Sequence, residues 1–522
     1  MFMSGRVQKL LTATLILLSG LGLRAQRVLY SPFIDDHFEV SGKVGDYYWI
    51  QKKETVKIDK RHSTSADTVE VKSFEIYDTR MNLISETTPY VMSDQLLKEY
   101  LVCNDDNFDQ LLIQSGKRKT NLLINRYRSN GSIVKEGANL ASFPFTESAN
   151  SFLLVRSEDK SKKLLLCFES AQSSSSRLHA ILFDENWRQI SYRIYDRLFI
   201  TQPLIQDDFT NYPIESYNSS PVKVANNGEW LMMMPSRANS NYSLFHFFTK
   251  DSSFVYREIK SPIYSVSEDV ALSIDNDKQE VIAGVLSSFR YPTLKNVEVV
   301  HYSMTGHQID FDSSYRFNTL VAYKIQDENI IHESFMAVPG AGFMLLKEYG
   351  KAYISPYDDN DYNSSRVLKF FFASNYITSS MKPLSLNRNG YTRYDKICGT
   401  RKIYERGDLC MFYFPASRKD SCWSGIINKE QITEFNVPWL SYLVVPMQRK
   451  LFLLYNSFFK NEIRYGNSTV LDLKGNLIND EGLVYWKFGN LLSFQQSRRI
   501  SDSELAIPYE NNRRYGFANI RF

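Results

Sequence analysis

The sequence predicts an all-β protein, a β-propeller of about eight four-stranded blades, and three observations support this fold class. Apolar runs of four to eight residues, such as DQLLIQS and KKLLLCF, recur along the chain and are typical of β-strands. A hairpin pattern recurs six times, at a spacing that matches the length of a propeller blade. Few stretches show helical periodicity, so strands account for the core.

The recurring pattern has an aromatic or leucine anchor, a turn, and an apolar residue seven positions after the anchor. Glycine occupies the fifth position in three copies, where a tight hairpin needs a positive φ. An aspartate follows the anchor in three copies, where its carboxylate can accept hydrogen bonds from the turn's own backbone. The copies are Tyr77–Ile84, Tyr127–Val134, Phe183–Ile190, Phe247–Phe254, Tyr302–Ile309 and Leu471–Ile478, the glycines are Gly131, Gly306 and Gly475, and the aspartates are Asp78, Asp184 and Asp472.

The spacing of the copies sets the expected number of blades. Successive anchors are 50, 56, 64 and 55 residues apart, and the last two are 169 apart. Because 169 is close to three times 56, we expect two less regular units in this gap, around residues 367–380 and 422–435. The mature length corresponds to about nine units, whereas propellers have about four to eight blades. The prediction is therefore eight blades, with seven to nine allowed.

The two ends of the chain complement each other. Residues 505–522 supply two strands and then stop where the last blade needs one more, and residues 27–33 (RVLYSPF) precede the first full unit. Pairing of the N-terminal and C-terminal strands would close the ring and leave no free sheet edge.

The first 25 residues predict a secretory signal peptide. Arg6 and Lys9 form a positive start, an apolar stretch runs over residues 10–23, and Ala25 precedes the expected cut. The apolar stretch is shorter than the roughly 20 residues of a membrane span, and no later segment is long enough. We therefore expect export to the periplasm, cell surface or medium, with residues 26–522 forming a single β-propeller domain without a transmembrane helix.

The charge balance argues against nucleic-acid binding. The chain has 62 Lys and Arg against 58 Asp and Glu, for a net charge of +4. Residues 1–25 hold three of the basic residues and no acidic one, so the mature chain is close to neutral. A global basic field that would attract nucleic acid is therefore missing.

The cysteines predict one hairpin disulfide. Of five cysteines, Cys410 and Cys422 stand symmetrically around residues 416–419, so in a hairpin centred there they would face each other. No CxxC pair occurs, so neither a zinc site nor a thioredoxin-like motif is expected.

The repeat resembles that of secreted bacterial β-propellers in general, over nearly the whole mature chain. The Trp-Asp blade ending of WD40 proteins, the Gly-Gly doublet of kelch repeats and the sialidase Asp-box are all missing from the sequence. The resemblance therefore implies a fold and carries over no functional residue.

Catalytic motifs are missing too. HExxH, GxSxG, GxxxxGKS and GxGxxG do not occur, so we expect no metal site and no cofactor. This favours a non-enzymatic protein, although a propeller can assemble an active site from residues on different blades.

Two loops supply the candidate binding residues, because exposed aromatic and acidic side chains can anchor a partner protein or a sugar. The first hypothesis is an exported protein-binding or scaffold module in a cell-surface or outer-membrane assembly, with another cell-envelope protein as its partner. The alternative is a propeller that binds or cleaves a glycan at one mouth of its central channel. The candidate residues are Tyr212, Tyr217, Tyr357, Asp358, Asp359, Asp361 and Tyr362.

Overall fold

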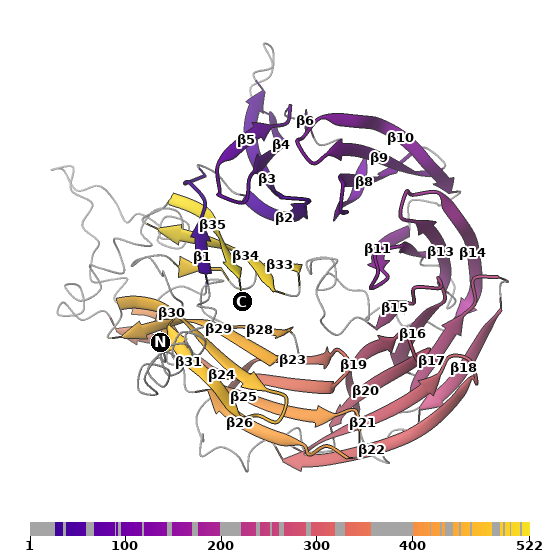
Figure 1. The fold of residues 1–522 in the computed structure, drawn as a ribbon, viewed down its shortest axis with the longest axis vertical. Coiled ribbons are helices and arrows are strands. Elements are labelled where there is room, and N and C mark those ends of the chain that lie inside the picture. The colour runs from indigo at the N-terminus through magenta and orange to yellow at the C-terminus, as the bar shows by residue number, and fades with distance from the viewer. Residues whose placement is uncertain are drawn as a thin grey trace, which may run out of the picture.

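The computed structural model shows a ring of eight antiparallel β-sheets, each with four strands, which confirms the predicted β-propeller (Figure 1). The described residues contain no helix. They are residues 27–34, 38–58, 67–88, 90–91, 95–116, 119–143, 149–169, 176–198, 221–235, 241–250, 253–259, 266–288, 294–318, 329–356, 400–417, 419–427, 431–433, 442–447, 450–459, 462–482, 491–493, 496–501, 503–511 and 514–521.

The first four blades follow one another in sequence, and each runs from an inner strand at the channel to an outer strand at the rim. Blade 1 has a short additional strand, β6, which continues the line of its outer strand beside β4. Blade 1 consists of β2 (Phe38–Val44), β3 (Tyr47–Ile58), β4 (Asp67–Tyr77), β5 (Leu83–Glu86) and β6 (Tyr90–Val91), and blade 2 consists of β7 (Leu96–Cys103), β8 (Asn107–Ser115), β9 (Thr120–Arg128) and β10 (Ile133–Phe143). Blade 3 consists of β11 (Ala149–Arg156), β12 (Lys162–Glu169), β13 (Ser176–Asp184) and β14 (Gln189–Leu198), and blade 4 consists of β15 (Val222–Val224), β16 (Trp230–Pro235), β17 (Tyr242–Phe247) and β18 (Phe254–Ile259).

The remaining blades complete the ring. In blade 6 the outer strand is split into β26 and β27, and in blade 8 the inner strand is split into β32 and β33. Blade 5 consists of β19 (Val266–Asp275), β20 (Glu280–Ser288), β21 (Leu294–Ser303) and β22 (Gln308–Asn318), and blade 6 consists of β23 (Asn329–Val338), β24 (Gly342–Pro356), β25 (Thr400–Pro415), β26 (Trp423–Ile427) and β27 (Gln431–Thr433). Blade 7 consists of β28 (Tyr442–Met447), β29 (Lys450–Phe459), β30 (Glu462–Asp472) and β31 (Leu477–Gly482), and blade 8 consists of β32 (Leu491–Leu492), β33 (Arg498–Ser501), β34 (Glu504–Asn511), β35 (Arg514–Arg521) and β1 (Arg27–Tyr30).

Blade 8 is closed by the N-terminal strand, as the sequence predicts. Strand β1 pairs antiparallel with β35, from Arg27 opposite Arg521 to Tyr30 opposite Ala518. The blade therefore takes three strands from the C-terminal end and its outer strand from the N-terminal end. Hydrogen bonding between the two ends replaces a covalent connection at this point of the ring.

The core lies between neighbouring blades rather than inside one sheet. Seven clusters of buried apolar residues occupy the successive blade interfaces. Between blades 1 and 2, Trp49 stacks on Phe108 with ring centroids 4.2 Å apart, and Phe74 and Tyr127 pack around them. Burial of such large rings contributes much of the stabilisation of an interface. Many of the aromatic residues thus serve packing.

The recurring pattern corresponds to the hairpin between the third and outer strands, which we call the outer turn. The Asp78, Asp184 and Asp472 carboxylates each accept hydrogen bonds from backbone N–H groups two and four residues later, at 2.8–2.9 Å, as predicted. Gly131 and Gly475 have φ of +89° and +81°. Gly306 differs from the prediction, because the positive φ of that turn lies one residue later, at His307 (+52°).

The outer turns of blades 2, 3, 5 and 7 also contact the preceding blade. Side chains and backbone carbonyls bridge the two blades through single hydrogen bonds, which explains why the sequence of this hairpin recurs. The donor and acceptor pairs are Ser85 Oγ to Asn130 O (2.9 Å), Trp187 Nε1 to Asp109 Oδ2 (2.8 Å), Arg257 Nε to His307 O (3.0 Å) and Trp423 Nε1 to Leu473 O (2.9 Å).

The docking of an outer turn can be tested at Gly475. A Cβ there would lie 2.7 Å from Trp423 Cδ2 of the preceding blade, at a φ that side chains rarely adopt. Gly340, at φ +66°, lies in a turn where a Cβ meets nothing within 4 Å, so Gly340→Ala carries only the backbone strain. We expect Gly340→Ala to lower the free energy of unfolding by about 1 kcal/mol and Gly475→Ala by about 1–3 kcal/mol more. Urea unfolding of both variants measures the difference, and equal values would contradict docking of this turn.

Two sequence-based predictions are corrected by the structure. The described residues in the gap between Tyr302 and Leu471 form one blade, blade 6, rather than two. Residues 422–435 contribute β26 and β27 to that blade, whereas residues 367–380 lie outside the described residues. Strands β24 and β25 are 15 and 16 residues long and the connection between them spans residues 357–399, so the extra length lies within one blade.

The predicted Cys410–Cys422 disulfide is not formed in this structure. The hairpin of β25 and β26 pairs Cys410 with Ile426 and Tyr413 with Trp423, so it is centred at residue 418, whereas pairing of Cys410 with Cys422 needs a centre at residue 416. Cys410 is buried between blades, whereas Cys422 is exposed at the turn. The register therefore keeps the two sulfurs apart.

Candidate functional site

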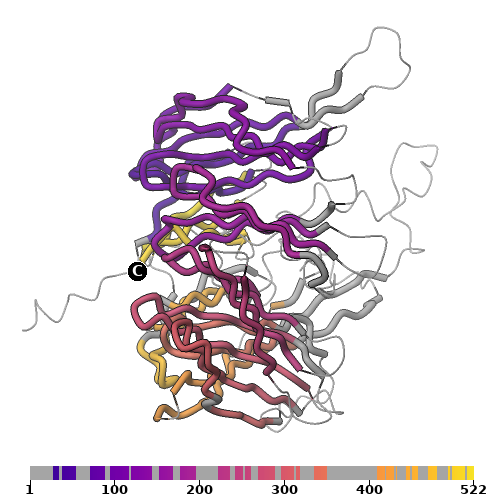
Figure 2. The backbone as a smooth tube through the Cα atoms, turned by 90° about the vertical axis from the view of Figure 1, so that its right-hand side faces the viewer, coloured from indigo at the N-terminus to yellow at the C-terminus, as the bar shows by residue number. Residues whose placement is uncertain are grey.

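The two faces of the ring differ in their connections. The turns between the first and second strands of a blade, here called inner turns, lie on the same face as the outer turns, because successive strands are antiparallel. We call this the turn face, and it lies at the left of Figure 2. The second-to-third connections and those between blades join strand ends on the opposite face.

The predicted binding residues all belong to connections of the opposite face. One loop connects β14 to β15 and the other connects β24 to β25. These residues lie outside the described part of the chain, so their role stays a prediction. They are Tyr212, Tyr217, Tyr357, Asp358, Asp359, Asp361 and Tyr362.

A cavity of about 580 Å³ opens at the channel on the turn face. Inner strands and inner turns of five blades, 3, 4, 5, 6 and 8, contribute its walls. This volume lies within the range of about 300–1,000 Å³ that is usual for ligand pockets. The residues around it are Arg156, Ser157, Glu158, Lys160, Lys223, Val224, Leu272, Ser273, Ile274, Asn276, Ala337, Pro339, Arg499, Ile500, Ser501 and Ser503.

The charge of the cavity is positive. Among the described residues that line it, four cationic side chains, from blades 3, 4 and 8, accompany a single carboxylate, Glu158. Because the chain as a whole has 62 basic against 58 acidic residues, this excess is local and would concentrate anions at the channel mouth. The cations are Arg156, Lys160, Lys223 and Arg499.

Three of these cations are held by the protein itself. Arg156 Nη1 donates to the Cys103 carbonyl at 2.8 Å, and Arg499 Nη1 donates to the Pro446 carbonyl at 3.1 Å. Lys160 forms an ion pair with Asp105 of blade 2 at 3.3 Å, where both side chains are largely exposed. Each contact fixes one end of the side chain against a neighbouring blade.

Lys223 differs from these three cations. It lies in β15 between the buried Val222 and Val224, and no described residue forms a hydrogen bond or an ion pair with its ammonium group. Burial lowers the pKa of Lys223 to about 8, and the Glu158 charge opposes this only in part. The desolvated ammonium group lacks the solvation it has in water, so an incoming anion would stabilise it.

Hydrogen bonds between inner turns fix the geometry of the cavity wall. The Asp159 N–H donates to Asn226 Oδ1 at 3.3 Å, and the Asn226 N–H donates to Asn276 Oδ1 at 2.8 Å. Asn276 Nδ2 in turn donates to Glu158 Oε2 at 3.0 Å. This chain connects the turns of blades 3, 4 and 5 and engages the one carboxylate of the cavity. A preorganised wall reduces the entropy lost when a ligand binds.

Several acidic and histidine side chains of blades 4 and 5 have structural contacts. Asp275 pairs with Lys278 at 2.8 Å, and Glu280 accepts from His301 Nδ1 at 2.7 Å. His246 contacts Tyr302 Oη of blade 5 at 3.0 Å and, within blade 4, Glu229 at 3.2 Å. Within the described ranges, no group of three or more such side chains could hold a metal ion.

Sequence reasoning missed the cavity because its residues are distant in the chain. Arg156, Lys223 and Arg499 come from different blades and share no motif. The recurring pattern marks outer turns, whereas the cavity is built from inner strands. One usable signal was a lysine between two valines in a strand as short as Val222–Val224.

Comparisons with known proteins assign this chain no family. No protein-family model and no curated protein matches the sequence. Among solved structures, the chain is similar to the β-propeller domain of the Trilobed protease from Pyrococcus furiosus, with 10% identity, a TM-score of 0.32, and coverage of 81% of this chain and 94% of that one.

Two further similarities are to longer peptidases. For prolyl oligopeptidase B from Galerina marginata the identity is 8%, the TM-score 0.35, and the coverage 97% of this chain and 60% of that chain. For an acylaminoacyl peptidase the values are 7%, 0.33, 69% and 43%. This chain thus spans less than two thirds of these two enzymes, and neither assigns it an activity.

Proposed function

We propose that this chain is an exported, non-enzymatic binding module that holds an acidic segment of a cell-envelope protein at its channel mouth. The observation that carries the proposal is the preorganised cavity, in which four cations face one carboxylate that is already engaged. An acidic segment would complement this charge and would gain from a wall that does not need to reorganise.

Export is part of the proposal and rests on residues 1–25, which have the layout of a signal peptide. The described residues contain no helix long and apolar enough to cross a membrane. Sequencing of the N-terminus of the protein from its native cells should find Gln26 as the first residue, whereas recovery of an intact Met1 from the envelope would contradict cleavage.

Site-specific photocrosslinking tests where the partner binds. A benzoylphenylalanine in place of Ser503, at the cavity wall, should crosslink one protein in intact cells. The same group in place of the exposed Lys135, on the outer strand of blade 2, should not. Equal crosslinking from both positions would argue against the channel mouth as the binding site.

Charge reversal provides a second measurement. Lys160→Glu with Lys223→Glu should abolish crosslinking from position 503, because the local field becomes acidic. Lys119→Glu with Lys135→Glu makes the same change in net charge on exposed residues of blade 2 outside the cavity and should leave the crosslink intact. Loss of the crosslink in both double variants would point to a general charge effect.

Glycan binding is the second candidate, because a cavity at the channel mouth is where a propeller would take a sugar. The cations favour an acidic glycan over a neutral one. Cleavage would need a pair of carboxylates about 5–9 Å apart, and the described residues around the cavity supply one, Glu158. A glycan array with sialylated, uronic and neutral members tests this candidate, and binding of neutral glycans alone would contradict it.

A further inference from the structure

We infer that Lys223 is the residue that makes the ionic contact with a ligand carboxylate in the channel cavity. This inference rests on the proposed function, which places an acidic segment in the cavity, and it names the side chain that selects the ligand's charge. The carboxylate would come from an Asp, a Glu or a chain end of the partner protein.

The contacts of the other cations support this assignment. Arg156 and Arg499 already donate to backbone carbonyls, and Lys160 is paired with Asp105. The charge of each of these groups is therefore already partly compensated by an acceptor of the protein. The charge of Lys223 is not compensated in this way, because none of the described residues accepts a hydrogen bond from it, and its ammonium group carries three donors.

The position of Lys223 in the fold also suits the role. It lies on an inner strand, so the sheet of blade 4 fixes its backbone through the pairing of Lys223 with Leu231. The turns of blades 3 and 5, which flank blade 4, are joined by the Asn276–Glu158 hydrogen bond of 3.0 Å. A donor on a rigid strand between two fixed turns loses little conformational freedom on binding.

The charged groups around Lys223 determine how its contact depends on pH. Glu158, Arg156 and Lys160 face the cavity from blade 3 and Arg499 faces it from blade 8, while the residues that blades 5 and 6 contribute are uncharged. Since the pKa of Lys223 is lowered to about 8, its charge disappears as the pH rises through that value, whereas the two arginines stay protonated. Binding should therefore weaken above about pH 8.

Binding of a hexaglutamate peptide to the purified mature protein tests the inference by calorimetry. Lys223→Gln should weaken binding about ten-fold or more, because a charge-assisted hydrogen bond is lost. Lys223→Arg should restore most of the affinity and remove the weakening above pH 8. The control Lys278→Gln, at an exposed lysine outside the cavity, should behave as the wild type.

A chemical probe tests accessibility without a bound peptide. Pyridoxal 5′-phosphate forms an imine with a neutral lysine amine, releasing water, and borohydride reduces the imine to a stable secondary amine. Peptide mapping at pH 7.5 should find Lys223 labelled ahead of the more exposed Lys278, whose pKa is raised by Asp275. Hexaglutamate should protect Lys223 from labelling.

The possible failures are distinguishable. The inference would be overturned if Lys223→Gln binds hexaglutamate with unchanged affinity, or if Lys223 is not labelled ahead of Lys278. This holds even if crosslinking from position 503 still identifies a partner. Binding of hexagalacturonate but not hexaglutamate, dependent on Lys223, would support the assignment of Lys223 and overturn the protein partner.

Discussion

A chain that begins at Ser31 is expected to have a free energy of unfolding about 3 kcal/mol lower than a chain that begins at Gln26. The truncation removes β1, and with it the buried Val28 and the edge-on contact of Tyr30 with Tyr509, whose ring centroids are 5.2 Å apart. It also exposes the edge of β35, with which all four residues of β1 pair. An open edge of this kind promotes association between chains.

Urea unfolding of the two chains measures the loss, and size-exclusion chromatography detects association. Adding a synthetic peptide of residues 26–32 should restore the midpoint in a concentration-dependent way, because the peptide binds the folded chain and not the unfolded one. An unchanged midpoint in the shorter chain would show that β1 contributes little to ring closure.

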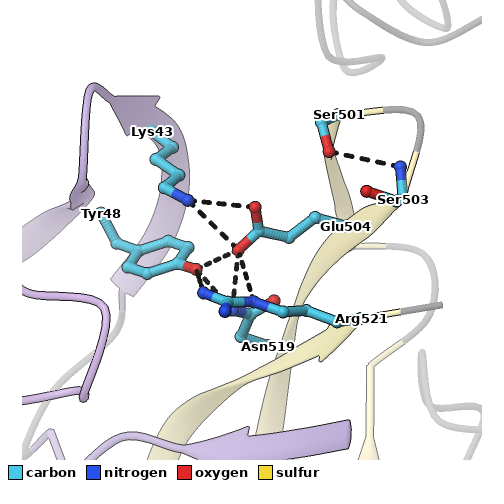
Figure 3. A network of polar contacts seen from close by, with 7 residues as sticks. All are labelled: Lys43, Tyr48, Ser501, Ser503, Glu504, Asn519 and Arg521. Atoms are coloured by element: carbon cyan, nitrogen blue, oxygen red, sulfur yellow. Dashed lines mark hydrogen bonds and ion pairs between the residues drawn. The ribbon is translucent and has the colours of Figure 1, made fainter. Parts of the chain in front are cut away.

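Replacement of Glu504 by glutamine is expected to lower the free energy of unfolding by about 2–3 kcal/mol. Glu504 lies at the interface of blades 8 and 1 and accepts from Lys43 at 3.1 Å, from Asn519 at 2.8 Å and from the Tyr48 hydroxyl (Figure 3). Arg521 Nε lies 3.5 Å from the same carboxylate. Removing the charge leaves these donors without the anion that compensates their burial.

The control is Glu39→Gln on blade 1. The Glu39–Lys53 pair has the same charge types at 3.4 Å, but both side chains are exposed, at 51% and 40%. An exposed pair of this kind contributes less than about 1 kcal/mol. If urea unfolding finds an equal loss in the free energy of unfolding for the two variants, the Glu504 network does not stabilise the interface of blades 8 and 1 more than an exposed ion pair would.

The Glu504 network also predicts a dependence on pH. Burial raises the pKa of Glu504, but the Tyr48 hydrogen bond and the Lys43 charge outweigh it, and the pKa lies below its ordinary value of 4.5. Folding thus favours the ionised form, so the stabilisation is complete above about pH 4.5 and is lost as the pH falls through the lower, folded-state value. Unfolding measured against pH should show this loss in the wild type and not in Glu504→Gln.

The fold was predictable because the outer turn recurs under one physical requirement. The turn must close a hairpin, and several copies also contact the preceding blade, so similar residues return, such as the aspartates of three copies, Asp78, Asp184 and Asp472. Blade 6 escaped the pattern because its outer turn is longer: Tyr413 pairs with Trp423, ten positions later, so no apolar partner stands at the seventh position. Because the strands β24 and β25 are long, blade 6 covers enough sequence to suggest one blade more than the gap contains.

The candidate site was less predictable, because it depends on which residues the closed ring brings together. Lys223 and Arg499 are far apart in sequence and meet only after eight blades are arranged around one channel. The sequence pointed instead to aromatic and acidic loops, such as the one around Tyr357 and Asp358, which lie outside the described residues. Local composition identifies exposed loops, whereas a cavity between inner strands requires the tertiary arrangement.

The docking of outer turns onto neighbouring blades has a consequence for how the chain tolerates insertions. An added residue beside Gly131 or Gly475 would press on the preceding blade, because these turns are already in contact with Ile76 and Trp423. Connections that join strand ends on the opposite face are not part of the recurring pattern, and the one between β24 and β25 already spans residues 357–399. We therefore expect the folded ring to accept a purification tag or reporter domain in such a connection with a smaller loss of stability than in an outer turn.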